Sequence, residues 1–498
     1  MGKSVLVVGA GLGGLSTALR LSSDGYDVTV VEKNSKAGGR LNLLQKDGFS
    51  WDLGPTFFSM SYEFRELIHY CKMEMPFRFV ELDPLYAVHF ADETKPRIIY
   101  KDLKKLVEEF RDVEPDFEKK MRRFLDETGR LFHDTEQVII RRNFDSILQY
   151  ALQLTRVPLK HAPKLFRTMW KELERHFTSF EVKVIFSLVG FFLGNTPFNT
   201  PAVFTLLSYT EMEHDGYYNV EGGMYKIVTT LMDELKKKGV QFAFNTEVVD
   251  YKADGKKING LIDDDGKEWN ADAYVINSDA AWFRGAVLKR PAYSEAKLDK
   301  MNWTMAPLTI YLGIKGKLDG MYHHNYFLRK NFKEYAGGIF QNKVSLDQPY
   351  YYVNIPSMHN PEYAPDDHES VFILCPVPDR RFKPSWDDAD EIADRIIDDL
   401  SERTGTNLKE RIVSRTVFSP IEWESKFRLF RGSGLGLGHN LMQVGGLRPR
   451  NFDEYYRNVF YVGASTTPGT GLPMTVISSR LVTERINQAY GLVSENQH

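Results

Sequence analysis

Five residues near the N-terminus have the types and the spacing that suit the binding of a dinucleotide. Gly9 permits a tight turn, Gly11 lets the backbone approach a pyrophosphate, and Gly14 allows a helix to pack closely on a strand. Gly13 belongs to the same glycine-rich loop. Glu32 follows Gly14 at close to the roughly twenty residues at which an acid accepts hydrogen bonds from ribose hydroxyls. These residues therefore predict a dinucleotide site near the start of the chain.

The elements around these residues must place them on a βαβ unit. Residues 3–8 and 28–31 are apolar runs typical of short strands, and residues 15–21 repeat apolar side chains at helical spacing. A helix that begins at the glycines directs unpaired N–H groups at phosphates. A glycine turn without a ligand is the alternative, but the strand, the helix and the acid coincide here. The pattern predicts a Rossmann-type domain.

Two further motifs distinguish a flavin from a nicotinamide as the ligand. Lys33 opens a run that ends in Gly38-Gly39-Arg40-Leu41, and Gly54-Pro55-Thr56 follows soon after it. Here the chain resembles the FAD-dependent amine oxidase and carotenoid desaturase superfamily, in which the Gly-Gly-Arg lies beside the pyrophosphate and the Gly-Pro-Thr lies near the flavin. Arginine suits this place because its planar fork pairs with phosphate oxygens in two bonds. The alternative for Arg40 is a solvated surface side chain.

Residues 459–475 carry the second specific motif. They have the pattern of an apolar strand and a glycine- and proline-rich loop, followed by a helix over 476–489. The segment closely resembles the C-terminal signature of bacterial phytoene-desaturase-like carotenoid desaturases, so the resemblance spans essentially the whole chain. It implies cofactor contacts from Gly463, Ala464, Leu472, Met474 and Thr475, with a helix N-terminus directed at the flavin carbonyl. Many family members carry glycine where this chain has Met474, which leaves the shape of the substrate channel open there.

The resemblance also implies cofactor contacts from the middle of the chain. Residues 217–224 resemble a family segment in which two glycines precede a helix near the flavin. In family members, the residue at the place of Val248 meets the adenine through its backbone. The apolar strand over 273–276 ends at Asn277, next to the cofactor in the family, although a strand-to-loop corner explains Asn277 almost as well.

Composition limits the class of protein and its partners. The chain has 498 residues, 42% of them hydrophobic and 26% charged, which is typical of a globular protein of two or three domains. The net charge is −3, so no basic field indicates a nucleic acid partner. Two cysteines outside any metal-binding pattern predict neither a disulfide framework nor a metal site, and favour a cytoplasmic protein. We expect no signal peptide and no transmembrane helix.

These patterns predict an α/β fold, α+β in part, with three domains. The FAD-binding domain is discontinuous and consists of residues 1–95, 215–290 and 440–495. Residues 100–214 form a helical insertion, because their apolar side chains recur at helical spacing. Residues 291–439 mix strands with a helix and form a substrate domain built as a sheet with helices against it.

Residues 157–177 have the mixture of aromatic and basic side chains that suits a helix at a membrane surface. Lys160, Lys164, Arg167, Lys171 and Arg175 supply the basic positions. An ordinary helix with a charged outer face is an equal alternative, because acidic residues are interspersed among them. The first interpretation predicts a cytoplasmic protein peripheral to the membrane that takes its substrate from the lipid.

The resemblance implies desaturation of a long apolar polyene, in which a hydride moves from an allylic carbon to flavin N5 and a proton leaves the neighbouring carbon. Within the family, the chain resembles desaturases of Bacteroidetes-type pathways, including those that act on 1-hydroxycarotenoids at the 3,4 position, and 3,4-desaturation of such a substrate is the activity we expect. A phytoene desaturase and an FAD-dependent carotene isomerase are the main alternatives. An amine oxidase and a flavin-free prenyl-protein carrier are further ones, although the intact fingerprint with Glu32 argues against the carrier.

Two expectations concern the catalytic groups and the electron acceptor. Asp145 is the candidate for a polar group near the reacting carbons, with a solvated helix carboxylate as its alternative. No second dinucleotide fingerprint is visible, so we expect oxygen or a membrane quinone as the electron acceptor instead of NAD.

Overall fold

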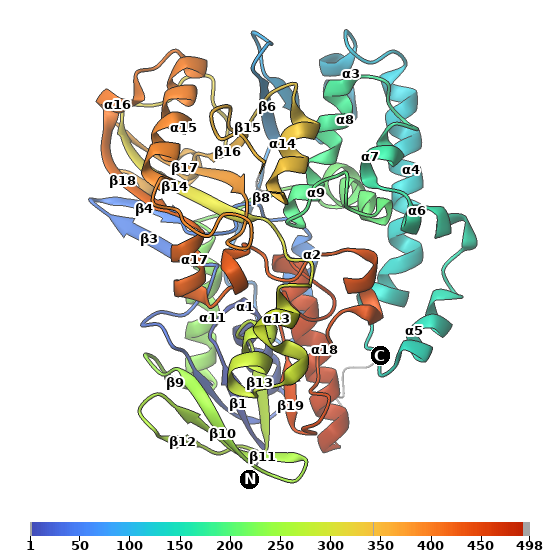
Figure 1. Ribbon diagram of the computed structural model, residues 1–498, viewed down its shortest axis with the longest axis vertical. Coiled ribbons are helices and arrows are strands. Elements are labelled where there is room, and N and C mark those ends of the chain that lie inside the picture. Colours follow the sequence, from blue (N-terminus) through green and yellow to red (C-terminus); the bar gives the residue numbers. More distant parts are fainter. Residues whose placement is uncertain (1, 342, 492–498) are drawn as a thin grey trace.

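The computed structural model describes residues 2–341 and 343–491, so the last residues of the predicted 440–495 segment lie outside it. A five-stranded parallel sheet forms the centre of its lower half (Figure 1). Its strands, in spatial order, are β19 (Val459–Tyr461), β13 (Ala273–Ile276), β1 (Ser4–Val8), β2 (Asp27–Val31) and β9 (Gln241–Ala243). The sheet therefore joins segments from the beginning, the middle and the end of the chain.

Helices pack on this sheet through the apolar side chains that the sequence pattern places on one face. They are α1 (Leu12–Ser23), α11 (Tyr225–Lys237) and α18 (Leu472–Tyr490), with α2 (Ser61–Tyr70) against α18. Gly14 is essential to this packing, because a Cβ at its position would overlap the carbonyl oxygen of Gly9. The predicted βαβ unit is confirmed, with α1 beginning at the glycine loop itself.

A seven-stranded sheet forms the upper half of the molecule. Its strands, in spatial order, are β18 (Ile412–Phe418), β14 (Ala306–Lys315), β17 (His368–Val377), β16 (Tyr351–Asn354), β15 (His324–Leu328), β6 (Tyr86–Phe90) and β7 (Arg97–Ile99). Four helices accompany it: α14 (Phe332–Ile339), α15 (Ala389–Thr404), α16 (Leu408–Arg411) and α17 (Pro420–Phe427). Strands β6 and β7 come from the N-terminal part of the chain, and β6 pairs in parallel with β15. The chain therefore leaves the five-stranded sheet after β2, adds β6 and β7 to the seven-stranded sheet, and returns to the five-stranded sheet at β9.

Smaller sheets complete the β-structure. A three-stranded antiparallel sheet contains β10 (Val248–Asp254), β11 (Lys257–Asp263) and β12 (Glu268–Trp269). Two-stranded sheets pair β3 (Leu43–Lys46) with β4 (Phe49–Asp52) and β5 (Phe79–Glu81) with β8 (Tyr218–Val220). Short helices α12 (Ala280–Trp282) and α13 (Glu295–Leu298) follow β13.

The segment between β7 and β8 is helical and lies on the right of Figure 1. Its helices are α3 (Leu103–Phe110), α4 (Phe117–Thr135), α5 (Ile147–Leu154), α6 (Ala162–Phe166), α7 (Met169–Leu173), α8 (Phe180–Ser187), α9 (Val189–Phe192) and α10 (Leu206–Tyr209). Side chains from α3, α4, α7 and α8 pack in the same hydrophobic core as the seven-stranded sheet. The α/β fold class is confirmed, whereas the division into three domains stays a prediction.

The predicted continuous amphipathic helix over residues 157–177 is wrong. This stretch contains a 3₁₀ turn (Leu159–His161) and the separate helices α6 and α7. The backbone of Arg167 is extended, and Thr168 starts a new helix by accepting a hydrogen bond from the Lys171 N–H at 3.4 Å. None of the described helices is long and apolar enough to cross a bilayer.

Candidate active site

A cavity of about 910 Å³ lies between the two large sheets and extends into the helical segment. The predicted cofactor-binding residues line it, except Gly14, which lies behind the loop and packs α1 on β1. The cavity thus brings together the glycine loop, the Gly39–Leu41 and Gly54–Thr56 segments, Val248, Asn277 and the C-terminal motif. Its volume is at the upper end of the range for small-molecule sites.

The glycine loop forms one wall of the cavity. A Cβ on Gly11 would lie 2.7 Å from Nδ2 of Asn277, which itself donates a hydrogen bond to the Gly9 carbonyl at 3.2 Å. Helix α1 begins directly after Gly11 without a side-chain cap, so its first N–H groups are available to an anion. The loop is therefore a narrow cradle of backbone donors that only glycine can form.

Glu32 holds the loop from the neighbouring strand. One carboxylate oxygen accepts a hydrogen bond from the Ala10 N–H at 2.8 Å, and the other accepts from the Asn34 N–H at 2.9 Å. The oxygen that accepts from the Asn34 N–H also accepts from the Asn34 side-chain amide at 2.8 Å. The other oxygen keeps a lone pair for a further donor, such as a ribose hydroxyl. Lys33 and Val248 line the same end of the cavity, and Val248 is buried.

Arg40 is a half-buried cation at the cavity wall. Its guanidinium donates to the Gly434 carbonyl at 3.0 Å, and no acidic side chain within residues 2–341 and 343–491 forms an ion pair with it. Burial lowers the pKa of Arg40, and the charge of Asp279 opposes this shift. A guanidinium with spare donors at a cavity wall suits an anion, and a pyrophosphate satisfies it in two parallel bonds.

The C-terminal loop lines the cavity next to the glycine loop and leads into α18. Helix α18 begins at Leu472 instead of the expected 476, because Pro473 fits the first turn of a helix, where no N–H bond is lost. Arg448 fixes the loop from behind and donates to the carbonyls of Ala464 at 2.5 Å and Thr466 at 2.9 Å. The sequence pattern gave no signal for Arg448, because its acceptors are carbonyl groups brought close only by folding.

Beyond these walls the cavity is aromatic. Phe57 packs against Phe192 and Tyr217 with ring centroids 4.8 and 4.9 Å apart. The Tyr352 hydroxyl lies 2.8 Å from the Thr56 hydroxyl and 2.6 Å from Nδ1 of His324. This part suits a long apolar molecule that must lie next to the Gly54–Thr56 segment.

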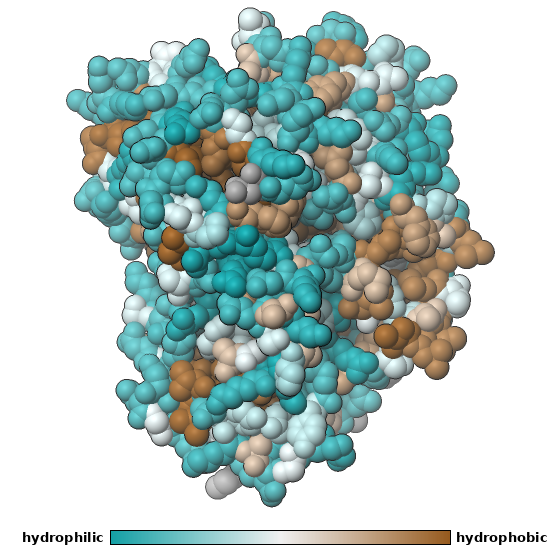
Figure 2. Space-filling view, in the orientation of Figure 1, coloured by the Kyte–Doolittle hydropathy of each residue, from teal (hydrophilic) through white to brown (hydrophobic). Residues whose placement is uncertain are grey.

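The cavity opens at the helical segment, where apolar side chains face the outside. Leu154, Val157, Leu159 and Leu165 line the opening, and Leu159 is 86% exposed. Further exposed apolar side chains surround it: Ile147, Leu148, Leu152 and Phe166. Figure 2 shows them as an apolar patch on the right of the molecule, over α5 and α6. We call these exposed residues, together with Leu159, the apolar rim.

Comparison with known proteins assigns the family. Residues 12–487 match the model of the flavin-containing amine oxidoreductase family. The chain belongs to this family.

Its similar relatives include carotenoid desaturases. The chain is 32% identical to the zeta-carotene-forming phytoene desaturase of Myxococcus xanthus over 97% of this chain and 94% of that protein. It is 27% identical to the carotenoid 3,4-desaturase of Haloarcula japonica over 97% of this chain and 98% of that protein. A solved oxidoreductase of Methanosarcina mazei shares the fold, with a TM-score of 0.63 and 17% identity over 97% and 100% of the two chains. The predicted carotenoid desaturase family is confirmed.

Members of this family contain a flavin, and the chain is an FAD-dependent oxidoreductase. The residues present fit FAD on structural grounds: a cradle that a Cβ would fill, a guanidinium at the cavity wall without an acidic partner among the described residues, and two uncapped helix N-termini at one cavity. The contacts predicted for the individual cofactor-binding residues stay predictions. All of these residues except Gly14 line the cavity.

Asp145 does not lie at the cavity of this oxidoreductase. Its carboxylate pairs with Arg485 at 2.5 Å, and its side chain is 69% exposed. The predicted role near the reacting carbons therefore has no supporting contact, and the solvated carboxylate describes Asp145 better. Met474, in contrast, lines the cavity, as the C-terminal resemblance implies.

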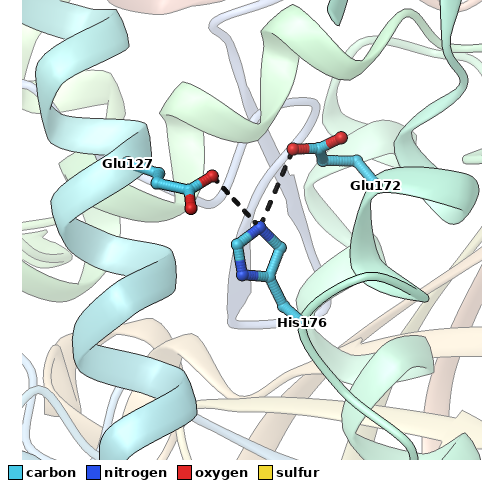
Figure 3. A group of neighbouring side chains, drawn as sticks. All are labelled: Glu127, Glu172 and His176. Carbon is cyan, nitrogen blue, oxygen red and sulfur yellow. Dashed lines mark ion pairs between the residues drawn. The ribbon is translucent and has the colours of Figure 1, made fainter.

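A buried group outside the cavity has the composition of a metal site but the environment of an ion-pair network. Glu127, Glu172 and His176 converge between α4 and α7 (Figure 3), with His176 Nε2 3.5 Å from Glu127 and 3.7 Å from Glu172. Glu172 also forms ion pairs with Lys164, Arg167 and Arg175. Burial raises the pKa of Glu172, but the nearby His176 and the hydrogen bonds from Lys164 and Arg167 outweigh it and hold the pKa below its usual range. Three cations already balance the carboxylate, which disfavours a metal ion.

Proposed function

We propose that this protein is a carotenoid desaturase, which introduces a conjugated double bond into a long polyene. The observation that supports this most is the cavity that joins the FAD wall to the apolar rim. A linear apolar molecule can enter at the rim, lie along the aromatic part and present one bond to the Gly54–Thr56 segment. The two relatives from Myxococcus xanthus and Haloarcula japonica are both named as desaturases of this kind.

The residues of the chain would hold and orient both molecules. Gly11, Arg40 and the N-terminus of α1 would bind the pyrophosphate, Glu32 the ribose, and the N-terminus of α18 the flavin carbonyl. FAD, when bound, supplies the acceptor for the hydride of the allylic carbon. The aromatic wall would exclude water and fix the polyene against this acceptor, which is the main requirement of such a reaction.

The substrate we favour is a 1-hydroxycarotenoid, desaturated at the 3,4 position, with a quinone or oxygen as the final electron acceptor. Phytoene desaturation is the second candidate, because the Myxococcus xanthus relative at 32% identity is a phytoene desaturase. We expect turnover in carotenoid-loaded liposomes only when quinone or oxygen is added, with a product that absorbs at longer wavelength. Product spectra from phytoene and a 1-hydroxycarotenoid distinguish the two candidates. Reduction of NAD would contradict the acceptor, and a product with rearranged double-bond geometry but no net oxidation would indicate an isomerase.

We also propose peripheral membrane association, but through the apolar rim instead of the basic residues of 157–177. Lys164 and Arg167 are engaged by Glu172 inside the protein, so they are poor candidates for lipid contacts. The exposed leucines and Phe166 at the opening are suited to insertion among acyl chains, from which a carotenoid can pass directly into the cavity.

A triple variant in which Leu152, Leu159 and Phe166 are all replaced by serine is expected to cosediment with liposomes about tenfold less or lower still. Each substitution removes apolar side-chain area that lipid would cover. Binding to phosphatidylcholine vesicles measures this without dependence on charge. The matched control replaces three exposed apolar residues elsewhere, Val249, Met358 and Val413, with serine. Equal losses in both variants would exclude the rim as the membrane contact.

A further inference from the structure

Three polar side chains lie in the enclosed, aromatic part of the cavity. Glu211 belongs to a π-helical turn (Thr210–His214), Tyr217 immediately precedes β8, and Tyr326 belongs to β15. All three line the cavity, with exposed fractions of 4%, 2% and 7%. A channel for a pure hydrocarbon has no need of polar groups at this depth, because burying them is costly.

Glu211 is a carboxyl without a counter-ion. The Tyr217 hydroxyl donates a hydrogen bond to one of its oxygens, and no cation in the described part of the chain pairs with it. Burial raises the pKa of Glu211 well above its usual value and so favours the neutral carboxyl. A protonated carboxyl can both donate and accept a hydrogen bond.

Tyr326 is a buried polar group without a partner among the described residues. Its hydroxyl has no hydrogen-bond partner among residues 2–341 and 343–491, although it is buried. A buried polar group without a partner is costly, and such groups often mark the place of an unseen partner. Glu211 and Tyr326 are therefore two polar groups at one aromatic cavity that can bind a small polar group of a ligand.

The position of the cluster relates it to the reacting end of the substrate. The rings of Tyr326 and Tyr352 are 5.3 Å apart, and the Tyr352 hydroxyl lies 2.8 Å from that of Thr56. Phe57, the residue after Thr56, packs on Tyr217. The cluster is thus next to the Gly54–Thr56 segment, where the proposed function places the bond to be oxidised.

We infer that Glu211, Tyr217 and Tyr326 form a subsite for an alcohol on the end group of the polyene, so the substrate class is a hydroxylated carotenoid. This inference rests on the proposed function and deepens it. A hydroxyl can accept a hydrogen bond from one member of the cluster and donate to another, whereas a hydrocarbon end would leave them unpaired. Sites built in this way discriminate strongly against analogues that lack the hydroxyl.

The test compares a 1-hydroxycarotenoid with the same polyene lacking the hydroxyl. We expect FAD-loaded protein to bind the alcohol about tenfold more tightly or better, as measured by the shift of the polyene absorbance. The kcat/KM for flavin bleaching should favour the alcohol by a similar factor. Tyr326→Phe removes one unsatisfied oxygen and should lower this preference about fivefold. Glu211→Leu should lower it further. Tyr335→Phe is the matched control, because Tyr335 is buried but its hydroxyl already donates to the Pro376 carbonyl at 3.1 Å.

The outcomes separate this subsite from the proposed function. Equal binding and bleaching of both polyenes by the unmodified protein, or a preference that survives Tyr326→Phe, would overturn the subsite and leave the desaturase proposal standing. Binding that favours the alcohol and weakens in Tyr326→Phe, without bleaching by either polyene, would support the subsite and refute the reaction. Tyr326→Phe should also be at least as stable to heat as the parent, and a clear loss of stability would indicate a structural hydroxyl instead.

Discussion

Replacing Gly11 with valine is expected to abolish the binding of FAD. The side chain would enter the cradle in which the backbone approaches the pyrophosphate, and its Cβ would crowd Nδ2 of Asn277 at 2.7 Å. Two or more N–H bonds to a charged phosphate, each worth about 1.5–3 kcal/mol, would be lost, which lowers affinity by about 100-fold or more. Flavin absorbance after purification and titration with FAD measures this effect.

The control for this variant is Gly337→Val, because nothing lies within 4 Å of a Cβ at Gly337 in α14. That variant should keep its flavin. Circular dichroism of Gly11→Val should match the parent, so that lost binding is separated from lost folding. A stable Gly11→Val protein that retains a full complement of FAD would refute the assignment of the glycine loop.

Replacing Glu172 with glutamine is expected to lower the free energy of unfolding by about 3–5 kcal/mol. The side chain of Glu172 is fully buried, and that of Lys164 is 8% exposed, so the substitution leaves a buried cation without its charge partner. The pKa of Glu172 is depressed in the folded protein, so its contribution is present above the unfolded-state pKa of about 4.3 and disappears as the pH falls through the lower folded value. The difference between parent and variant should therefore shrink in strong acid.

Glu174→Gln is the matched control, since Glu174 is exposed and only accepts a hydrogen bond from Trp170 at 2.9 Å, which an amide oxygen can also accept. Urea unfolding at neutral pH and in acid compares the three proteins. A Glu172→Gln variant as stable as the parent would mean that the cations reach solvent. Added zinc that stabilises the parent and Glu174→Gln but not Glu172→Gln would indicate a metal site at Glu172 after all.

The parts of the site that could be predicted from the sequence are those built from local motifs. The glycine loop, Glu32 and the loop before α18 each depend on residues close together in the chain, and backbone geometry restricts which residues can occupy them. Strands β14 and β17 and helix α15 were also predictable, because their apolar periodicity is regular over many residues.

The remaining parts depend on contacts between distant segments. Glu211 and Tyr326 are 115 positions apart on a turn and a strand, and neither has a local pattern that indicates a shared cavity. Arg448 binds carbonyl groups, which every residue has, so its acceptors cannot be recognised in a sequence. The membrane contact of 157–177 stays a prediction, but its periodicity did not show the break into two helices or the pairing of Lys164 and Arg167 with Glu172.

The most direct test of the central claim is a single anaerobic turnover of the FAD-loaded protein in liposomes that contain a carotenoid. We predict that a 1-hydroxycarotenoid bleaches the flavin absorbance while a longer-wavelength polyene appears in equal amount, and that putrescine, an amine, leaves the flavin oxidised. Bleaching by the amine, or an oxidised flavin with both phytoene and the 1-hydroxycarotenoid, would contradict the account.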